Sequence, residues 1–287
     1  MSRDWADTVA QRLISCDLVQ TGACLILGAA DTGKTTLAAA LAKRVASSRP
    51  VAVVDADIGQ SHIGPPATVG WAVVDNPVAD FSQLTPKGIS FVGDVTPLRH
   101  LLQLTAAVTQ CVRQASETAE LVLVDTPGLV HGPAAAALWW TMHRILQPRL
   151  ILAVQRNDEL EQILSGLKSF DSPIERIRCP SGIPLKSREH RYNYRRTCFG
   201  KYFEDSRLYD VDLSRVAIQP GWVFDPHSLL HRLVALRDGR GVDLAVGITN
   251  DWQADKNIAA IKAPQLDIAQ IRALVVGDIS IDPDDLS

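Results

Sequence analysis

The chain has 287 residues, of which 46% are hydrophobic, and its formal net charge at pH 7 is −3. This length allows one large domain or one domain with a small appendage, and we favour the second arrangement. The slightly negative balance argues against a protein that coats nucleic acid through its overall charge.

The sequence also carries signals of location. No apolar run approaches the roughly 18 residues that a membrane-spanning helix needs, and the first residues lack the apolar core of a signal peptide, so we expect no membrane association. The five cysteines are scattered without C-x-x-C spacing. That usage offers neither a zinc site nor a disulfide framework and is typical of a reducing compartment, so we expect a cytoplasmic protein.

The first predicted elements surround a glycine-rich motif. Apolar residues at helical spacing predict an amphipathic helix over residues 3–16, and the apolar run 23–27 predicts a strand. Residues 28–35 read GAADTGKT and fit the pattern G-x-x-x-x-G-K-[ST], and a helix-like run follows over 36–45. Strand, glycine-rich turn and helix N-terminus aim backbone N–H groups at one point, so we predict a phosphate-binding loop for a nucleoside triphosphate.

Two side chains of this loop have predicted roles in catalysis. Lys34 would reach the terminal phosphates, and the Thr35 hydroxyl would ligate magnesium. The candidate nucleotide-binding residues are Gly28, Asp31, Thr32, Gly33, Lys34, Thr35 and Thr36.

Three further apolar runs follow at residues 51–55, 121–125 and 150–154. Each run is continuous, as expected for strands that are buried on both faces of a parallel sheet. Helical patterns occupy residues 98–119 and 133–146, and short strand–helix–strand crossovers make such a sheet parallel. We therefore predict an α/β fold, in which a P-loop NTPase domain has a parallel sheet flanked by helices.

Two regions depart from this pattern. Prolines punctuate residues 61–93, where we expect an insertion over the nucleotide face. Beyond about residue 205 the pattern changes to short alternating runs that are typical of strands. These runs are residues 233–237, 242–248 and 273–281. We predict a P-loop domain over 1–205 and a small β-rich C-terminal domain over 206–287.

Acidic residues follow two of the predicted strands, and the carboxyl ends of such strands converge on the ligand crevice. Asp125 begins the sequence DTPG, at the position where P-loop proteins hold magnesium directly or through water. Asp55 and Asp57 fall on one side just past another strand, and one of them could accept a proton from an attacking hydroxyl. His62 and His131 lie near phosphate-side loops, and we interpret both as polar loop residues.

A compact basic element lies between Lys186 and Lys201, where six basic residues stand against the single acid Glu189. A basic element on an acidic body indicates a local anion site. If the segment is helical, Arg191 and Arg195 share one face. Two guanidiniums on such a lid would stabilise charge that develops on a transferred phosphoryl group.

Together these motifs resemble one family, the polynucleotide 5′-hydroxyl kinases related to the RNA kinase subunit of the pre-mRNA cleavage factor and to the nucleolar kinases of ribosomal RNA processing. The phosphate-binding loop is followed, in order, by five blocks that are similar to those of the family. They are DIGQ at 57–60, GPPATVG at 64–70, FVGDVTP at 91–97, DTPGLV at 125–130 and the arginine-bearing segment that ends in KYF at 201–203. The resemblance covers roughly residues 22–205.

The resemblance implies phosphorylation of a 5′-hydroxyl end of RNA or DNA, with ATP and Mg²⁺ as cofactors and nucleic acid as the partner. It makes residues 1–205 a P-loop kinase domain whose lid spans about 185–203. The catalytic residues that it implies are Lys34, Asp57, Arg191 and Arg195. Thr35 and Asp125 would hold the metal, and Gln60 and Thr96 would lie near the acceptor.

Several choices stay open at this level. The resemblance does not choose between RNA and DNA or name protein partners, and Arg188 and Arg196 leave the register of the two lid arginines open. One alternative is a regulatory or metal-delivery P-loop GTPase or ATPase, because DTPG also resembles the D-x-x-G of guanine-nucleotide switches. Residues 155–159 read QRNDE, however, and lack an N-K-x-D guanine reader. A non-catalytic ATP-binding scaffold in RNA processing is the other alternative, and the acceptor-side Asp57 argues against it.

Overall fold

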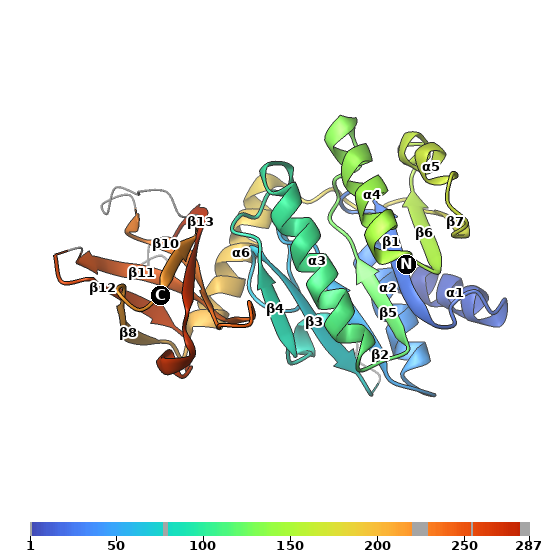
Figure 1. Ribbon diagram of the computed structural model, residues 1–287. Helices are drawn as coiled ribbons and strands as arrows, with labels where there is room; N and C mark the ends of the chain where they lie inside the picture. The colour runs from blue at the N-terminus through green and yellow to red at the C-terminus, as the bar shows by residue number, and fades with distance from the viewer. Residues whose placement is uncertain (1, 77–79, 220–228, 254, 282–287) are drawn as a thin grey trace.

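A sheet with helices on both faces forms the N-terminal part of the computed structural model, which describes residues 2–76, 80–219, 229–253 and 255–281 (Figure 1). Its strands are β1 (Gly22–Gly28), β2 (Val51–Asp55), β3 (Thr68–Val74), β4 (Gly88–Phe91), β5 (Leu121–Asp125), β6 (Leu150–Gln155) and β7 (Ile174–Arg178). Their order across the sheet is β7-β6-β1-β5-β2-β3-β4. The P-loop element β1 is therefore central, between β6 and β5.

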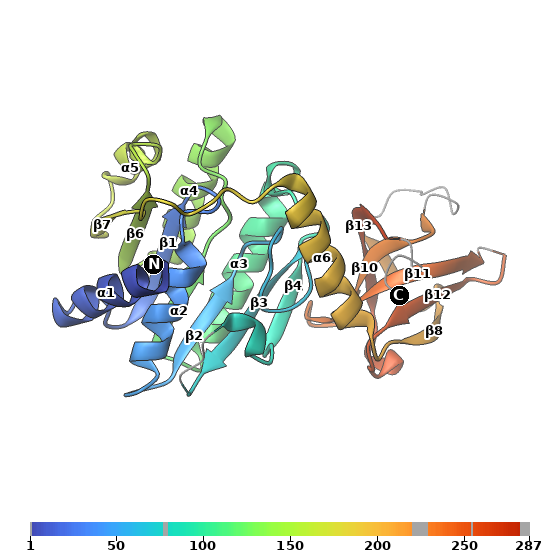
Figure 2. The same ribbon diagram turned by 180° about the vertical axis from the view of Figure 1, so that it is seen from behind.

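Five helices cover the two faces of this sheet. They are α1 (Ser2–Ser15), α2 (Lys34–Val45), α3 (Leu101–Ser116), α4 (Gly132–Leu146) and α5 (Glu161–Leu167). Helices α3, α4 and α5 pack on one face, and α1 and α2 pack on the other, as Figures 1 and 2 show from opposite sides. In the described part of the chain, no helix combines the length and apolarity that crossing a membrane requires.

The continuous apolar strands are explained by these two layers. Leu25 and Leu27 of β1 contribute to the core under α3 and α4, whereas Cys24 and Ile26 contribute to the core under α1 and α2. Successive side chains of a strand point to opposite faces, so both sets must be apolar. The prediction of helix-flanked buried strands is confirmed.

The sheet is mixed rather than wholly parallel. Strands β7, β6, β1, β5 and β2 pair in parallel, and the prediction of a parallel sheet holds for them. Strands β3 and β4 continue the sheet in antiparallel pairing. The expected insertion over residues 61–93 is thus wrong for these two strands. Trp71 packs in one core and Ala72 in the other, so β3 is buried on both faces like its neighbours.

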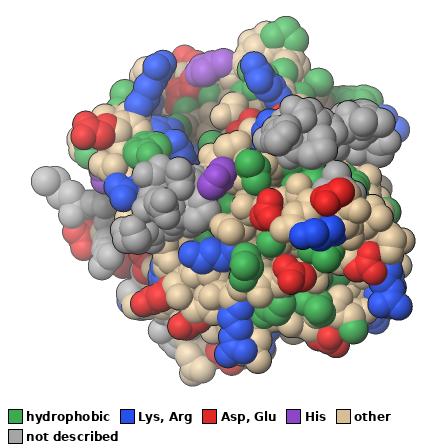
Figure 3. All heavy atoms as spheres, turned by 90° about the vertical axis from the view of Figure 1, so that its left-hand side faces the viewer, with side chains coloured by type: hydrophobic (Ala, Val, Ile, Leu, Met, Phe, Trp, Pro, Cys, Tyr) green, Lys and Arg blue, Asp and Glu red, His purple; other side chains and the backbone are tan. Residues whose placement is uncertain are grey.

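The C-terminal part is β-rich, as predicted. Its strands are β8 (Arg207–Asp212), β9 (Ala217–Gln219), β10 (Arg232–Arg237), β11 (Asp243–Gln253), β12 (Ile258–Ala263) and β13 (Ala273–Ser280). Strand β10 pairs antiparallel with β11 and β13, and β12 bridges β11 and β8. Figure 3 looks onto this end of the molecule, where basic and acidic side chains are interspersed.

The two parts share a core and one point of sheet pairing. Strand β11 pairs with β4 through Asp243 and Ile89. Helix α6 (Arg188–Phe203) lies nearer the viewer than β4 in Figure 2 and buries Phe199 and Phe203 against residues of β10 and β11. The boundary predicted at residue 205 stays a prediction, since α6 and the strands after it pack together.

Candidate phosphoryl-transfer site

The phosphate-binding loop joins the buried end of β1 to the first turn of α2. Gly33 has a left-handed φ of 91°, which glycine adopts without strain, and α2 begins at the next residue. Nζ of Lys34 and Oγ1 of Thr32 each donate a hydrogen bond of 2.9 Å to the carbonyl oxygen of Ala29. The loop is thereby closed around the N-terminus of α2, which is a favourable place for an anion.

Thr35 and Asp125 meet beside this loop. Oγ1 of Thr35 donates a hydrogen bond of 2.5 Å to Oδ2 of Asp125. Oδ1 of Asp125 is buried and has no hydrogen-bond partner among the described residues. Burial raises the pKa of Asp125, while the Lys34 ammonium acts in the opposite direction. This orphaned carboxylate oxygen beside a hydroxyl is a suitable donor set for Mg²⁺, which takes oxygen ligands.

The second nucleotide motif lies directly against the first. A Cβ placed on Gly128 would lie 2.6 Å from the backbone nitrogen of Ala30, so the DTPG turn reaches the phosphate-binding loop only because this residue is glycine. Strands β2 and β5 pair Asp55 with Asp125 at the same edge. The acidic residues that follow the strands therefore converge at the crevice, as the sequence predicts.

Asp55 is buried and organises the loop that follows β2. Its side chain is 1% exposed and accepts hydrogen bonds from the backbone N–H groups of Asp57 (3.1 Å), His62 (2.5 Å) and Ile63 (3.1 Å). Burial raises the pKa of Asp55 to about 7. Because this carboxylate faces its own loop, it is not the candidate for contact with an acceptor.

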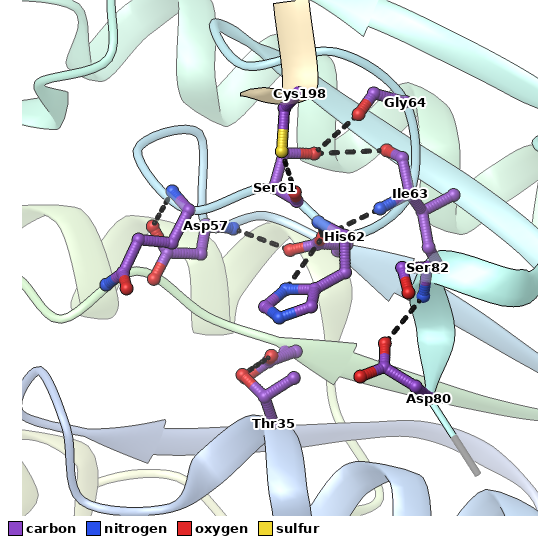
Figure 4. A network of polar contacts seen from close by, with 12 residues as sticks. Thr35, Asp57, Ser61, His62, Ile63, Gly64, Asp80, Ser82 and Cys198 are labelled. Carbon is purple, nitrogen blue, oxygen red and sulfur yellow. Dashed lines mark hydrogen bonds and ion pairs between the residues drawn. The ribbon is translucent and has the colours of Figure 1, made fainter. Parts of the chain in front are cut away.

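Asp57 occupies the position expected of that candidate. Its Oδ1 accepts hydrogen bonds from the backbone N–H groups of Gly59 (3.2 Å) and Gln60 (3.1 Å), which hold the side chain in place. The residue is only partly buried and lines a cavity of about 490 Å³. Figure 4 shows Asp57 and Thr35 on different sides of this space.

Residues from several segments line the cavity together. Among the predicted site residues, those that line it are Asp31, Gly33, Lys34, Thr35, Thr36, Asp57 and Gln60. The loop after β2 also contributes His62, and the lid contributes Lys186 and His190. Phosphate-side and acceptor-side residues thus share one space, as a direct transfer between two substrates requires.

The lid helix α6 is docked on the phosphate-binding loop. Ser187 caps the helix by accepting a hydrogen bond of 3.0 Å from the backbone N–H of His190. Nη2 of Arg191 donates a hydrogen bond of 2.6 Å to Oδ2 of Asp31, and the backbone N–H of Lys186 donates to the same oxygen. Nζ of Lys186 donates a hydrogen bond of 2.7 Å to Oε1 of Gln60, so the lid contacts both the phosphate side and the acceptor side.

The other predicted residues lie further out. Arg195 is half-buried on α6, where burial and then the neighbouring Arg191 lower its pKa and Asp94 opposes them. Thr96 is exposed, but its segment packs on the acceptor loop, since a Cβ on Gly59 would lie 2.9 Å from the carbonyl oxygen of Val95. The structure bonds Arg191 to Asp31 of the phosphate-binding loop, and it places Arg195 near enough to both Arg191 and Asp94 for each to affect its pKa.

The cavity residues outside the predicted set include Lys186 and His62. Lys186 belongs to the basic element, but its contact with Gln60 joins positions 126 residues apart, which no local pattern shows. His62 is a loop residue, as the sequence indicates, and the structure places it in the wall of the cavity. Its position two residues after the DIGQ block is the one sequence signal that could have indicated this.

The family to which the chain belongs agrees with this site. Residues 28–205, more than half of the chain, match the family described as the mRNA cleavage and polyadenylation factor CLP1 P-loop. The chain belongs to this family. The resemblance drawn from the sequence motifs is thereby confirmed.

Two archaeal proteins are among the named relatives of this chain. A polyribonucleotide 5′-hydroxyl-kinase of Pyrococcus horikoshii is 33% identical over 195 residues, which cover 68% of this chain and 53% of that protein. One of Pyrococcus abyssi is 31% identical over 239 residues, covering 79% of this chain and 66% of that protein. The chain therefore spans between about half and two thirds of the length of these relatives.

A solved structure, that of the wild-type Clp1p–Pcf11p (454–563) complex, has the same fold. Its TM-score is 0.71 at 13% identity, and the match covers 96% of this chain and 77% of that one. At this identity the likeness establishes the fold alone. Because the match covers nearly the whole chain, the fold likeness includes the β-rich part.

Proposed function

We propose that this chain is an ATP-dependent polynucleotide 5′-hydroxyl kinase, which transfers the γ-phosphate of ATP to the 5′-hydroxyl end of RNA or DNA. The observation that carries the proposal is the single cavity that Asp57 shares with Lys34 and Thr35. A kinase needs a carboxylate near the acceptor oxygen in addition to cations around the phosphates. The names of the archaeal relatives favour RNA as the acceptor.

The residues have distinct roles in this reaction. The 5′-oxygen forms a bond to the γ-phosphorus while the bond from that phosphorus to the β,γ-bridging oxygen breaks, and its electron pair leaves with ADP. The hydroxyl proton passes to the carboxylate of Asp57. Lys34 neutralises charge on the terminal phosphates, and Arg191 and Arg195 extend this positive field from the lid. Gln60, held by Lys186, and Thr96 lie on the acceptor side.

Magnesium belongs to the proposal as a cofactor. Thr35 and Asp125 would hold the ion, because the unpartnered Oδ1 of Asp125 and the hydroxyl of Thr35 supply oxygen ligands at the crevice. When bound, the ion would neutralise charge on the phosphates. The protein's own contribution is to keep the Asp125 carboxylate buried and aimed at the loop.

The alternative function of a guanine-nucleotide switch has less support than the kinase function. The segment after β6, where such proteins carry a base reader, holds Arg156 instead. Nη2 of Arg156 donates hydrogen bonds to the carbonyl oxygens of Asp31 (2.5 Å) and Ile183 (3.3 Å). This side chain therefore braces the phosphate-binding loop against the segment that leads into the lid. A scaffold without catalysis has no use for Asp57 in the cavity.

We also propose that the protein acts in the cytoplasm. All five cysteines are free, and three of them are buried, which supports a reducing compartment.

A transfer assay tests the proposed function. The full chain is incubated with Mg²⁺ and γ-labelled ATP, and with matched oligonucleotides that are 5′-OH RNA, 5′-OH DNA or 5′-phosphorylated RNA. We expect label on the 5′-OH ends and none on the blocked RNA, and no transfer by Lys34→Ala, which lacks the cation at the phosphates. Label that is released only as inorganic phosphate, with or without an acceptor, would contradict the proposal.

A further inference from the structure

His62 lies in the cavity wall between the acceptor side and the phosphate side. Its side chain is 19% exposed, and the ring lines the same cavity as Lys34, Thr35 and Asp57. Figure 4 shows the ring on the acceptor loop, pointing toward Thr35. A side chain in this place can reach a group that lies between Asp57 and Thr35.

Asp55 and Tyr194 set the orientation of the His62 ring. Oδ2 of Asp55 accepts a hydrogen bond from the backbone N–H of His62 and lies 3.9 Å from Nδ1 of the same residue. This Nδ1 is buried and has no hydrogen-bond partner among the described residues. On the lid side, the ring of Tyr194 lies 5.8 Å from that of His62, and its hydroxyl donates to the carbonyl oxygen of Ser61. The Nδ1 edge thus faces the buried carboxylate, and the Nε2 edge is left for the cavity.

The acceptor wall needs a donor of this kind. Asp31, Asp57 and Asp80 line the cavity, and Asp125 lies beside it at Thr35, so carboxylates surround the space that a highly charged phosphoryl group must enter. Lys34 supplies a cation from the phosphate-binding loop, and Lys186, which precedes the lid helix, lines the same cavity while its Nζ donates to Oε1 of Gln60, so neither cation belongs to the acceptor loop itself. A ring N–H from the acceptor wall would offset the repulsion where charge develops during transfer, and preorganised donors act most strongly at that place.

We propose that Nε2–H of His62 donates a hydrogen bond to a non-bridging oxygen of the phosphoryl group during transfer, which makes His62 a further catalytic residue. The inference rests on the proposed kinase function. In the transfer step described above, the bond from the 5′-oxygen to phosphorus forms and the bond to ADP breaks. The acceptor proton goes to Asp57. His62 acts in its imidazolium form, with Nδ1–H toward Asp55 and Nε2–H toward the phosphoryl oxygen, and keeps both ring protons throughout.

Two amide variants separate the two edges of the ring. The side-chain nitrogen of glutamine falls near the position of Nε2, and that of asparagine falls near Nδ1. In single-turnover transfer from ATP to 5′-OH RNA, we expect His62→Asn to lose about 100-fold in rate and His62→Gln to stay at least about tenfold above it. Equilibrium binding of ATP should stay within about twofold in both, because the bond strengthens only in the transition state.

Equal rates for the two variants, or a faster His62→Asn, would overturn the assignment, since the role of the ring would then lie at the Asp55 edge. As a check that does not depend on the amides, His62→Gly is assayed with and without added imidazole. We expect imidazole to raise the transfer rate of this variant at least about tenfold. The absence of any restoration also counts against the proposal.

A matched control comes from another histidine of the same chain. His131 is exposed before α4 and makes no side-chain cap to that helix, so His131→Asn should transfer within about twofold of the wild-type rate. Wild-type protein that forms no acceptor-dependent product contradicts the proposed kinase function. Active wild-type protein together with a fully active His62→Asn contradicts only the role of His62.

Discussion

Asp55 and Asp57 are two positions apart in the sequence, yet their surroundings give them different roles. The first is buried, and three backbone N–H groups bind its carboxylate, so it holds the acceptor loop in shape. The second is bonded at one oxygen by two N–H groups and lines the cavity. Burial raises the pKa of Asp55 to about 7 through desolvation.

Asp57→Asn tests the proposed role of this carboxylate directly. Asparagine keeps the shape and one acceptor oxygen for the N–H groups of Gly59 and Gln60, but it cannot take the proton of the attacking hydroxyl. We expect the single-turnover transfer rate to fall by about 100- to 10,000-fold, while ATP affinity stays within about twofold. Calorimetric ATP binding beside quench-flow transfer checks both. A variant that loses ATP affinity and keeps its turnover would show that Asp57 serves the nucleotide instead.

The lid helix is the element that ties the site together, because its two ends are anchored in different parts of the molecule. At the N-terminal end, Arg191 and the backbone of Lys186 meet Asp31, whose side chain is 3% exposed. At the other end, Phe199 and Phe203 are buried in the core shared with β10 and β11. A change at the first end should therefore loosen one turn of α6 without releasing the helix.

Arg191→Met tests this division. Removal of the guanidinium leaves the buried Asp31 carboxylate with a weaker set of partners, so amide hydrogen exchange over residues 186–191 should rise while residues 199–203 stay protected. We expect transfer to slow by about 10- to 1,000-fold, the range for one lost charge-stabilising donor. Arg188→Met, on an exposed position of the same helix, should change neither readout by more than about twofold. The opposite ranking would assign the lid role to Arg188.

At the scale of elements, the sequence was most informative where one local pattern decides the structure. Continuous apolar runs predicted β1, β2, β5 and β6, because strands buried on two faces need them. The antiparallel direction of β3 and β4 was missed, since it follows from how residues 56–67 reverse the chain. The docking of Arg191 on Asp31 was missed for a similar reason. It joins positions 160 residues apart, and periodicity carries no information at that range.

At the scale of the whole molecule, an ion pair with a buried carboxylate, Arg237–Asp243, lies where the P-loop part meets the β-rich part. The Asp243 side chain is fully buried and accepts two hydrogen bonds from Arg237, from Nε at 2.7 Å and Nη2 at 3.2 Å. It also accepts the backbone N–H of Phe91, at the end of β4. The Asp243 carboxylate thus accepts hydrogen bonds from Arg237 of the β-rich part and from Phe91 of the P-loop part. We therefore expect the two parts to unfold together.

Arg237→Met is expected to weaken this joint measurably. The change strands a buried carboxylate, and we expect a loss of about 2 to 3 kcal/mol in the free energy of unfolding, at or below the low end for buried pairs because the Arg237 side chain is 23% exposed. Urea unfolding followed by tryptophan fluorescence and by far-UV circular dichroism measures this loss. The two probes should give one coincident transition in the wild type.

The double variant Arg237→Met with Asp243→Asn supplies the control. Asparagine is neutral and can still accept the N–H of Phe91, so the double variant should lose less than Arg237→Met alone. This ordering identifies the stranded charge, rather than lost packing of the arginine stem, as the source of the effect. If Arg237→Met unfolds along the wild-type curve, or if the wild-type probes separate into two transitions, the joint does not couple the two parts.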